Sequence, residues 1–202
     1  QMRAGAGAPP PASFDDYVIS YMGEIIANGV ESSVWSGTGA TAGEFEGFLT
    51  ATTGIFAVDG TVNSSTASGA YTAANIIANL QTLTADMATD ISAVLRKEDL
   101  HIYMSPKTYA LYVSAVSTLG YVNAYNMNGD YAPVFEGYKI AVCNGMANDQ
   151  LVAAEKSNLF FGTDLLSDQT RISLMDMAAL DGSDNMRLVA RYSGGVQLGI
   201  GA

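Results

Sequence analysis

Residues 100–119, with the sequence LHIYMSPKTYALYVSAVSTL, join a short apolar run directly to a helix start. The run Leu100–Met104 is typical of a buried strand. Ser105 is a favourable N-cap, and Pro106 suits the first turn of a helix, where its missing N–H costs no hydrogen bond. This junction predicts a strand at 100–104 followed by a helix within 105–119.

Two more helices are predicted upstream of this junction. The first lies within 72–96, where apolar residues recur every three or four positions and share one helical face: Ile76, Leu80, Leu83, Met87, Ile91 and Val94. The second covers 14–31, with Ser13 as its expected N-cap. It carries a similar stripe: Tyr17, Val18, Tyr21, Met22, Ile25, Ile26 and Gly29.

The C-terminal half is rich in strand-like runs. These are 137–143, 151–154, 158–161, 170–176, 186–192 and 194–200, with a turn at 181–185. A shorter strand is predicted at 54–58, whereas 1–13, the rest of 32–68 and 121–136 are expected to be irregular. The order of elements indicates an α+β fold, with helices packed on antiparallel β-structure.

The composition favours a protein that hides much of its surface. Hydrophobic residues make up 49% of the 202-residue chain and charged residues 14%, against about a quarter in average globular chains. Extensive subunit contact explains this composition, and an ordinary Ala/Gly-rich domain explains it equally well. The net charge of −11 argues against direct binding to nucleic acid or to an anionic membrane surface.

The sequence offers little to build an active site. His101 is the only histidine and lies in an apolar strand, so we expect it to pack. Cys143 is the only cysteine and is expected to be a buried strand residue. Gly37–Gly43 lacks the Gly-Lys-Ser/Thr ending of a phosphate-binding loop. We therefore predict no catalytic residue, no cofactor site and no metal site.

Clustered carboxylates have simple structural explanations. Asp15 and Asp16 suit the N-terminus of the first helix, and Glu44 and Glu46 lie in a glycine-bearing loop. The run Asp181–Asn185 lacks the twelve-residue pattern of a calcium-binding EF-hand loop, and a β-turn explains it better.

Several short motifs occur in an order that resembles one known family. In the N-terminal part they are Trp35-Ser36-Gly37 after a long helix, Gly47-Phe48-Leu49, and Tyr103-Met104-Ser105-Pro106. In the C-terminal part they are Gly137-Tyr138-Lys139-Ile140, the run from Asn158 to Asp164 with Asp168, and Arg191 to Gln197. Together, over roughly residues 14–200, they resemble the major capsid proteins of tailed bacteriophages, the Hong Kong 97-like fold shared with encapsulin shells.

The resemblance implies a peripheral (P) domain and an axial (A) domain. Residues 1–13 would be an irregular lead-in, 14–99 with 156–202 would be P-domain-like, and 100–155 would be A-domain-like. The family's N-terminal arm and E-loop have no counterpart in these residues. Because the chain opens on Gln1, we expect a processed product, an expression fragment or part of a longer chain.

The implied function is structural rather than enzymatic. The chain would assemble with copies of itself as pentamers and hexamers into an icosahedral virion shell, made in the bacterial host cytoplasm. It would contact other virion proteins and enclose DNA without binding it specifically, with no membrane involved. One alternative is the shell of an encapsulin-type nanocompartment. Another, from a different class, is a small α+β hydrolase or ligand-binding domain.

The resemblance also implies an inter-subunit contact. Residues 121–135 contain Tyr121, Tyr125 and Tyr131 but no lysine or arginine. Tyrosine favours protein contact surfaces, and a plain surface loop is the simpler alternative. At the axial tip this segment would meet its copies, so replacing the three tyrosines together with Ser should weaken ring formation while leaving the subunit folded.

Overall fold

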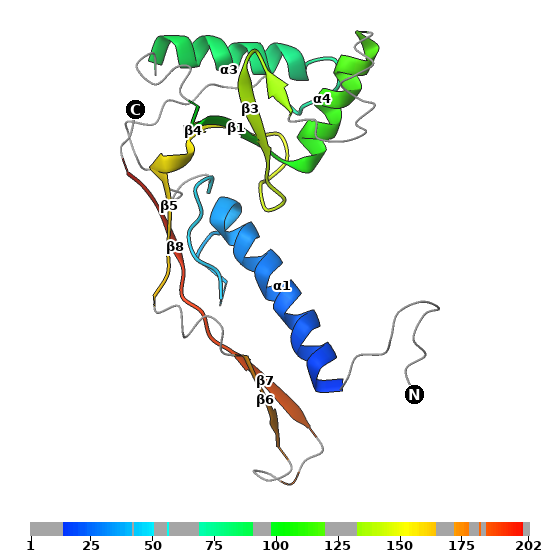
Figure 1. Cartoon of the computed structure of the whole chain (residues 1–202), viewed down its shortest axis with the longest axis vertical. Coiled ribbons are helices and arrows are strands. Elements are labelled where there is room, and N and C mark those ends of the chain that lie inside the picture. Colours follow the sequence, from blue (N-terminus) through cyan, green and yellow to red (C-terminus); the bar gives the residue numbers. More distant parts are fainter. Residues whose placement is uncertain are drawn as a thin grey trace. The chain divides into compact units, whose positions relative to one another are not determined.

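The computed structural model describes residues 14–41, 43–50, 56, 69–90, 98–119, 133–164, 172–177, 182 and 185–199, which form a mixed α+β fold (Figure 1). Its contacts divide the chain into two compact units. One unit comprises Gln1–Val30 and Thr163–Gly194, and the other comprises Glu31–Gly162 and Gly195–Ala202.

Helix α1 spans Phe14–Ser36, so the helix predicted at 14–31 is confirmed but continues for more than a turn. The expected end near residue 32 was wrong. The Gly/Ser-rich sequence suggested a loop from Ser32, but contacts with distant segments support the last turn of the helix, as described below. The predicted N-cap, Ser13, lies outside the described residues.

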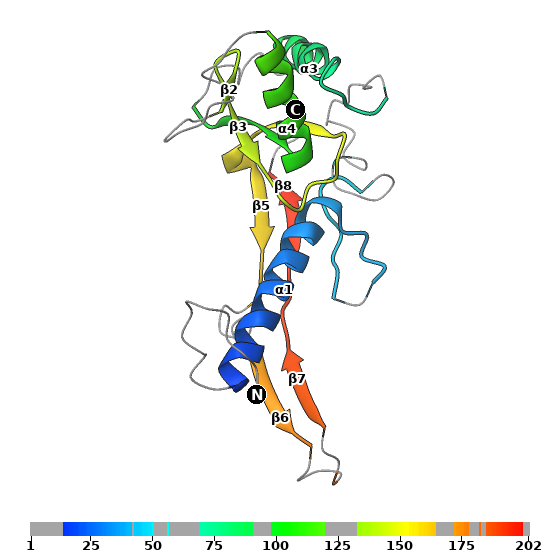
Figure 2. The same ribbon diagram turned by 90° about the vertical axis from the view of Figure 1, so that its right-hand side faces the viewer.

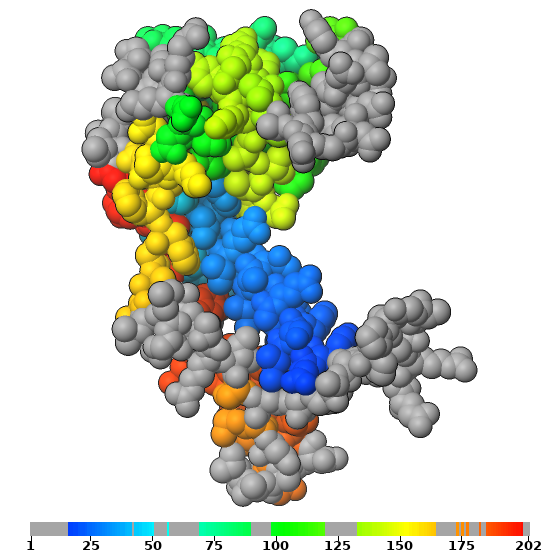
Figure 3. All heavy atoms as spheres, in the orientation of Figure 1, coloured from blue at the N-terminus to red at the C-terminus, as the bar shows by residue number. Residues whose placement is uncertain are grey.

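The apolar stripe of α1 is wider than the face that the fold covers. Val18, Met22 and Ile26 are half-buried. Tyr17, Tyr21 and Ile25 are exposed, at 43%, 54% and 46%. Figure 3 shows the atoms of α1 (blue) at the surface. A 3.6-residue period identifies an apolar face, but it does not fix how much of that face another element covers.

In the same unit as residues 14–30, β6 (Ile172–Asp176) and β7 (Met186–Ala190) form an antiparallel two-stranded ribbon (Figure 2). Both strands were predicted. The Met177 N–H donates to the carbonyl of Asn185 and closes the ribbon. Of the predicted turn at 181–185, only Gly182 and Asn185 are described, and Gly182 has a φ of 73°.

The second unit contains a four-stranded mixed sheet in the order β2-β3-β1-β4. Its strands are β1 (Leu100–Met104), β2 (Val134–Phe135), β3 (Tyr138–Val142) and β4 (Leu151–Glu155). β1 and β3 are parallel, whereas the other two pairings are antiparallel. The expectation of antiparallel structure therefore holds for two pairings of this sheet and was wrong for the pairing of β1 with β3. The long connection between β1 and β3, which includes a helix, gives the chain the length that a parallel crossover requires.

Strand β2 corrects the last part of the predicted loop at 121–136, of which residues 121–132 lie outside the described residues. Val134 is exposed and Phe135 is buried, which is the alternation of a one-sided strand. Glu136 and Gly137 have φ values of 49° and 92°, as the two central residues of a tight hairpin turn require. The Asn/Gly/Tyr-rich sequence before β2 suggested a continuous loop, so this short hairpin was not predicted.

Helix α4 (Pro106–Thr118) follows β1 as predicted. The hydroxyl oxygen of its N-cap, Ser105, accepts a hydrogen bond from the Thr108 N–H at 3.2 Å. An N-cap of this type contributes about 1 kcal/mol. Thr108 itself is buried, so the cap anchors the start of α4 at the end of the sheet.

Helix α3 (Ile76–Asp90) confirms the predicted helix within 72–96. Ile76 and Leu80 are fully buried and Met87 is 4% exposed. Full burial of such a side chain contributes about 1.5–3 kcal/mol. The last two residues of the predicted stripe, Ile91 and Val94, lie outside the described residues.

The two faces of the sheet are covered by different parts of the chain. Ile102 and Ile140 are register partners on one face of the sheet. They belong to a buried cluster that α3 and α4 complete, and its other members are Tyr71, Ile76, Leu80, Met104, Tyr112, Ala115 and Phe135. Tyr103 and Val152 are partners on the other face, in a second cluster: Trp35, Phe48, Met146, Val196 and Leu198. The sheet is thus the middle layer of this unit.

The division implied by the resemblance, with 14–99 and 156–202 in one domain and 100–155 in the other, stays a prediction. Helix α3 packs on the sheet in the unit that also holds 100–155, where Ile76 and Leu80 are buried.

Strands β5 (Leu159–Gly162) and β8 (Gly195–Leu198) form a second antiparallel ribbon, preceded by a short 3₁₀ helix, η1 (Lys156–Asn158). Both strands were predicted. The strand predicted at 54–58 lies outside the described residues except for Phe56, which is helical. Because Phe56 is helical, the strand prediction was wrong at this residue, whose N–H donates to the Phe48 carbonyl.

Candidate functional site: the end of helix α1

The last turn of α1 is capped by a segment from the following loop. The final carbonyls of any helix lack partners within the helix. Here the Phe48 N–H donates to the Val34 carbonyl at 3.0 Å, and the Leu49 N–H donates to the Trp35 carbonyl at 2.8 Å. The Gly47 N–H also donates to the Gly37 carbonyl at 2.9 Å. Two motifs that were separate in the sequence therefore form one packing site.

Close backbone approach explains the glycines of both motifs. A Cβ atom on Gly37 would lie 2.1 Å from the Phe45 carbonyl oxygen. A Cβ atom on Gly47 would lie 2.6 Å from the Ser33 carbonyl oxygen. Neither position has room for a larger residue without moving backbone atoms. The hydroxyl of Thr50 also donates to the Gly37 carbonyl.

A second connection joins α1 to the turn after β3. The Glu31 Oε1 atom accepts hydrogen bonds from the N–H groups of Asn144, at 2.9 Å, and Gly145, at 3.3 Å. A Cβ atom on Gly145 would lie 2.2 Å from the Glu31 carbonyl oxygen. The Ser36 hydroxyl donates to the Gly145 carbonyl at 3.4 Å. Glu31 thus ties the helix to a turn more than a hundred residues away.

Aromatic side chains fill the space between these backbone contacts and the sheet. Trp35 is 6% exposed, and its ring centroid lies 5.7 Å from that of Phe48 and 5.4 Å from that of Tyr103. Both ring pairs are tilted, an arrangement that adds to the energy gained by burial. Trp35 therefore links α1, the capping loop and β1.

Burial keeps two titratable groups at this site neutral. It raises the pKa of the Tyr103 phenol to about 12, with smaller contributions from Cys143 and Asp99. It also raises the pKa of the Cys143 thiol to about 11, helped by the negative charge of Glu31. A thiol of this kind is a poor nucleophile at neutral pH. Cys143 lies just after β3 and is half-buried, so the expectation of a buried strand residue was wrong by one position and in degree.

His101 lies on β1, between Lys139 and Ala154 on the neighbouring strands. Its Nδ1 atom is 2.7 Å from the Asp99 carbonyl oxygen. Because a carbonyl can only accept, Nδ1 carries the proton of this hydrogen bond, which holds the ring in place. The Asp99 carboxylate also accepts from the Ser157 N–H, and this bond lowers the pKa of Asp99.

The two glutamates of the loop after α1, Glu44 and Glu46, make different contacts with Thr38. The Thr38 hydroxyl donates to Glu44 Oε2 at 2.9 Å, and this hydrogen bond lowers the pKa of Glu44. Glu46 forms an isolated antiparallel bridge with Thr38. Glu44 thus organises an exposed loop.

The other predicted positions are not brought to this site. Tyr121, Tyr125 and Tyr131 lie outside the described residues, so their proposed contact stays a prediction. Within the described ranges, no three His, Cys, Asp or Glu side chains gather where they could hold a metal ion. Among the helices described, none combines the length and apolarity needed to cross a membrane.

The sequence does not indicate the roles of Glu31 and Gly145 at this site. The glutamate was one acidic residue near a helix end, and the glycine was one of 21. Their pairing depends on tertiary contact, and nothing in the local sequence signals it. A scan against protein-family models and a search of curated proteins find no match to this chain.

Proposed function

We propose that this chain is a shell-forming structural subunit with the Hong Kong 97-like fold of tailed-phage major capsid proteins. In this proposal, copies assemble as pentamers and hexamers into an icosahedral shell that encloses phage DNA. The chain would perform no catalysis.

The proposal is supported mainly by large apolar side chains that are exposed on helix α1 and on the two-stranded ribbons. They include Tyr17, Tyr21 and Ile25 on α1, Phe160 and Phe161 on β5, and Met175 and Met186 on the β6–β7 ribbon. Two-stranded ribbons are marginal by themselves in water. Surfaces of this kind are typical of subunits that complete their burial by association.

The packing at the end of α1 supports the fold part of the proposal. The resemblance rests partly on Trp35-Ser36-Gly37 and Gly47-Phe48-Leu49, and these segments cap each other through backbone hydrogen bonds. The glycines in both have steric reasons to be glycine. The two short motifs on which the resemblance partly rests thus share one physical role, which is to close the end of α1.

Electron microscopy of the expressed protein tests the proposal. We expect rings or closed shells made of this chain. Particles that remain single subunits at every concentration would contradict it. An encapsulin-type shell would assemble equally well but would contain a protein cargo rather than DNA, so analysis of particles isolated from the native source separates the two.

A further inference from the structure

We propose that the exposed stripe of α1 binds the β6–β7 ribbon of a second copy of this chain. The α1 stripe consists of Tyr17, Tyr21, Glu24 and Ile25, and the ribbon face centres on Met175 and Arg187. This inference rests on the proposed function, since it names the surfaces through which subunits would meet.

The α1 stripe is a mostly apolar surface whose side chains are exposed. Residues 17, 21, 24 and 25 follow the spacing of one helical face, and all four are exposed. The rings of Tyr17 and Tyr21 are stacked, with centroids 6.3 Å apart and planes inclined by 5°. Glu24 places one carboxylate within this apolar stripe.

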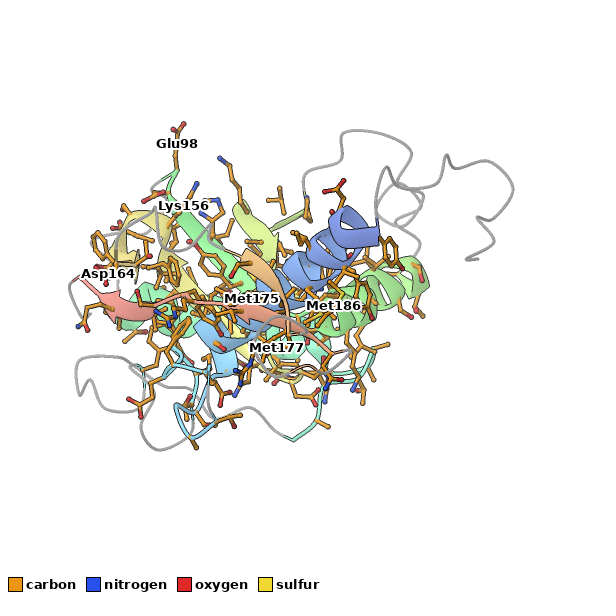
Figure 4. All side chains as sticks on the ribbon, turned by 90° about the horizontal axis from the view of Figure 1, so that it is seen from below. Glu98, Lys156, Asp164, Met175, Met177 and Met186 are labelled. Carbon is orange, nitrogen blue, oxygen red and sulfur yellow. The ribbon has the colours of Figure 1, made fainter. Side chains whose placement is uncertain are left out.

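The ribbon face presents chemistry that fits the α1 stripe. Met175 and Arg187 are direct register partners, so their side chains lie on the same face of the ribbon. Met175 is 43% exposed and Arg187 is exposed. Figure 4 labels Met175 together with Met177 and Met186 at the same end of the ribbon, and Met186, which is next to Arg187 on β7, belongs to the other face. A thioether packs favourably against aromatic rings, and a guanidinium pairs with a carboxylate.

The two proposed surfaces carry charges of opposite sign, because Asp176 of β6 is one position from Met175 and belongs to the other face of the ribbon. Helix α1 contains no lysine or arginine, and the exposed residues of its first half include Asp16 and Glu24. The described cations of the same unit are Arg187, on β7, and Arg191, just after it, and both are exposed. The two surfaces are therefore complementary in sign as well as in apolar character, which favours pairing between copies.

Both surfaces belong to one subunit but lie on different elements, so the contact is heterologous. Each copy would offer its α1 stripe to one neighbour and its ribbon face to the other. A heterologous contact repeats from copy to copy and closes into a ring when the rotation allows. The inference therefore supplies the head-to-tail geometry that pentamers and hexamers need.

Charge reversal tests the contact. Arg187→Glu and Glu24→Arg should each raise the protein concentration at half-assembly about tenfold or more, as measured by sedimentation velocity. The double variant, which exchanges the charges, should restore assembly toward the wild-type concentration. Lys107→Glu, at an exposed position on α4, is the matched control and should have little effect. Circular dichroism verifies that each variant is folded.

Disulfide trapping reads the contact directly, even if a charge variant folds poorly. In a Cys143→Ala background, a mixture of Tyr21→Cys and Met175→Cys subunits should form a mixed disulfide dimer on mild oxidation. As the control, a mixture of Tyr21→Cys and Leu119→Cys subunits should form no mixed disulfide dimer, although Leu119 is also exposed. If the wild type assembles but neither test gives the expected result, the contact is wrong while the shell proposal stands. A wild type that never assembles contradicts both.

Discussion

The carboxylate of Glu31 accepts a 2.9 Å hydrogen bond from the backbone N–H of Asn144, which lies 113 positions later in the chain. The same oxygen also accepts from Gly145. This link ties the second half of α1 to the turn after β3. Glu31→Gln keeps an acceptor oxygen but removes its charge, and hydrogen bonds to charged groups are the stronger ones.

We therefore expect Glu31→Gln to lower the free energy of unfolding by about 1 kcal/mol, as measured by urea denaturation. Glu98→Gln, at an exposed turn, is the control and should have no measurable effect. Equal stability of the two variants would show that the Glu31 link contributes nothing.

The second prediction compares two glycine-to-alanine substitutions. Gly47→Ala forces a Cβ atom against the Ser33 carbonyl and should destabilise the fold by about 1–3 kcal/mol. Gly29→Ala is the matched variant, because it lies within α1 with nothing within 4 Å of its Cβ position. Since alanine favours the helix, Gly29→Ala should stabilise the protein by about 0.5–1 kcal/mol. Thermal unfolding of both proteins checks the opposite signs.

The third prediction concerns alkaline pH. The folded state raises the pKa of Cys143 from 9.0 to about 11 and that of Tyr103 from 10.0 to about 12. Each folded pKa lies above the unfolded value, so the contribution to stability is complete below pH 9 and is lost as the pH rises toward 12. Tyr103→Phe should reduce the loss between pH 10 and 12. An unchanged pH profile would contradict the assignment.

The thiol of Cys143 should also react slowly in the folded protein. A rise in pKa from 9.0 to about 11 reduces the thiolate fraction at pH 8 by about 100-fold. Labelling with an alkylating reagent at pH 8 should therefore be at least about 100-fold slower in the native protein than in the urea-unfolded protein. Comparable rates would mean that the thiol is not held in this environment.

The sequence predicted individual helices and strands better than it predicted which of them pack or pair together. The Ser105-Pro106 junction and the stripe from Ile76 to Met87 carry strong local signals, and both helices form where expected. The parallel pairing of β1 with β3 and the extension of α1 to Ser36 depend on contacts between distant segments. Local patterns contain no information about such contacts, so these predictions failed.

At the candidate site the same limit applies. The glycines of Trp35-Ser36-Gly37 and Gly47-Phe48-Leu49 were visible as motifs, but their shared purpose emerges only when the two segments meet. His101 was predicted to pack, and its ring is held by the Asp99 carbonyl. Its role is still testable. His101→Phe should leave assembly intact and change stability by about 1 kcal/mol, whereas loss of turnover on a substrate with the fold preserved would contradict a purely structural role.

Native mass spectrometry of the purified protein over a range of concentrations distinguishes a shell-forming subunit from a monomer. A shell-forming subunit should give species with five and six times the mass of the 21.1 kDa chain, together with larger closed shells. A single species at 21.1 kDa at all concentrations would contradict the claim that this chain is a shell-forming subunit.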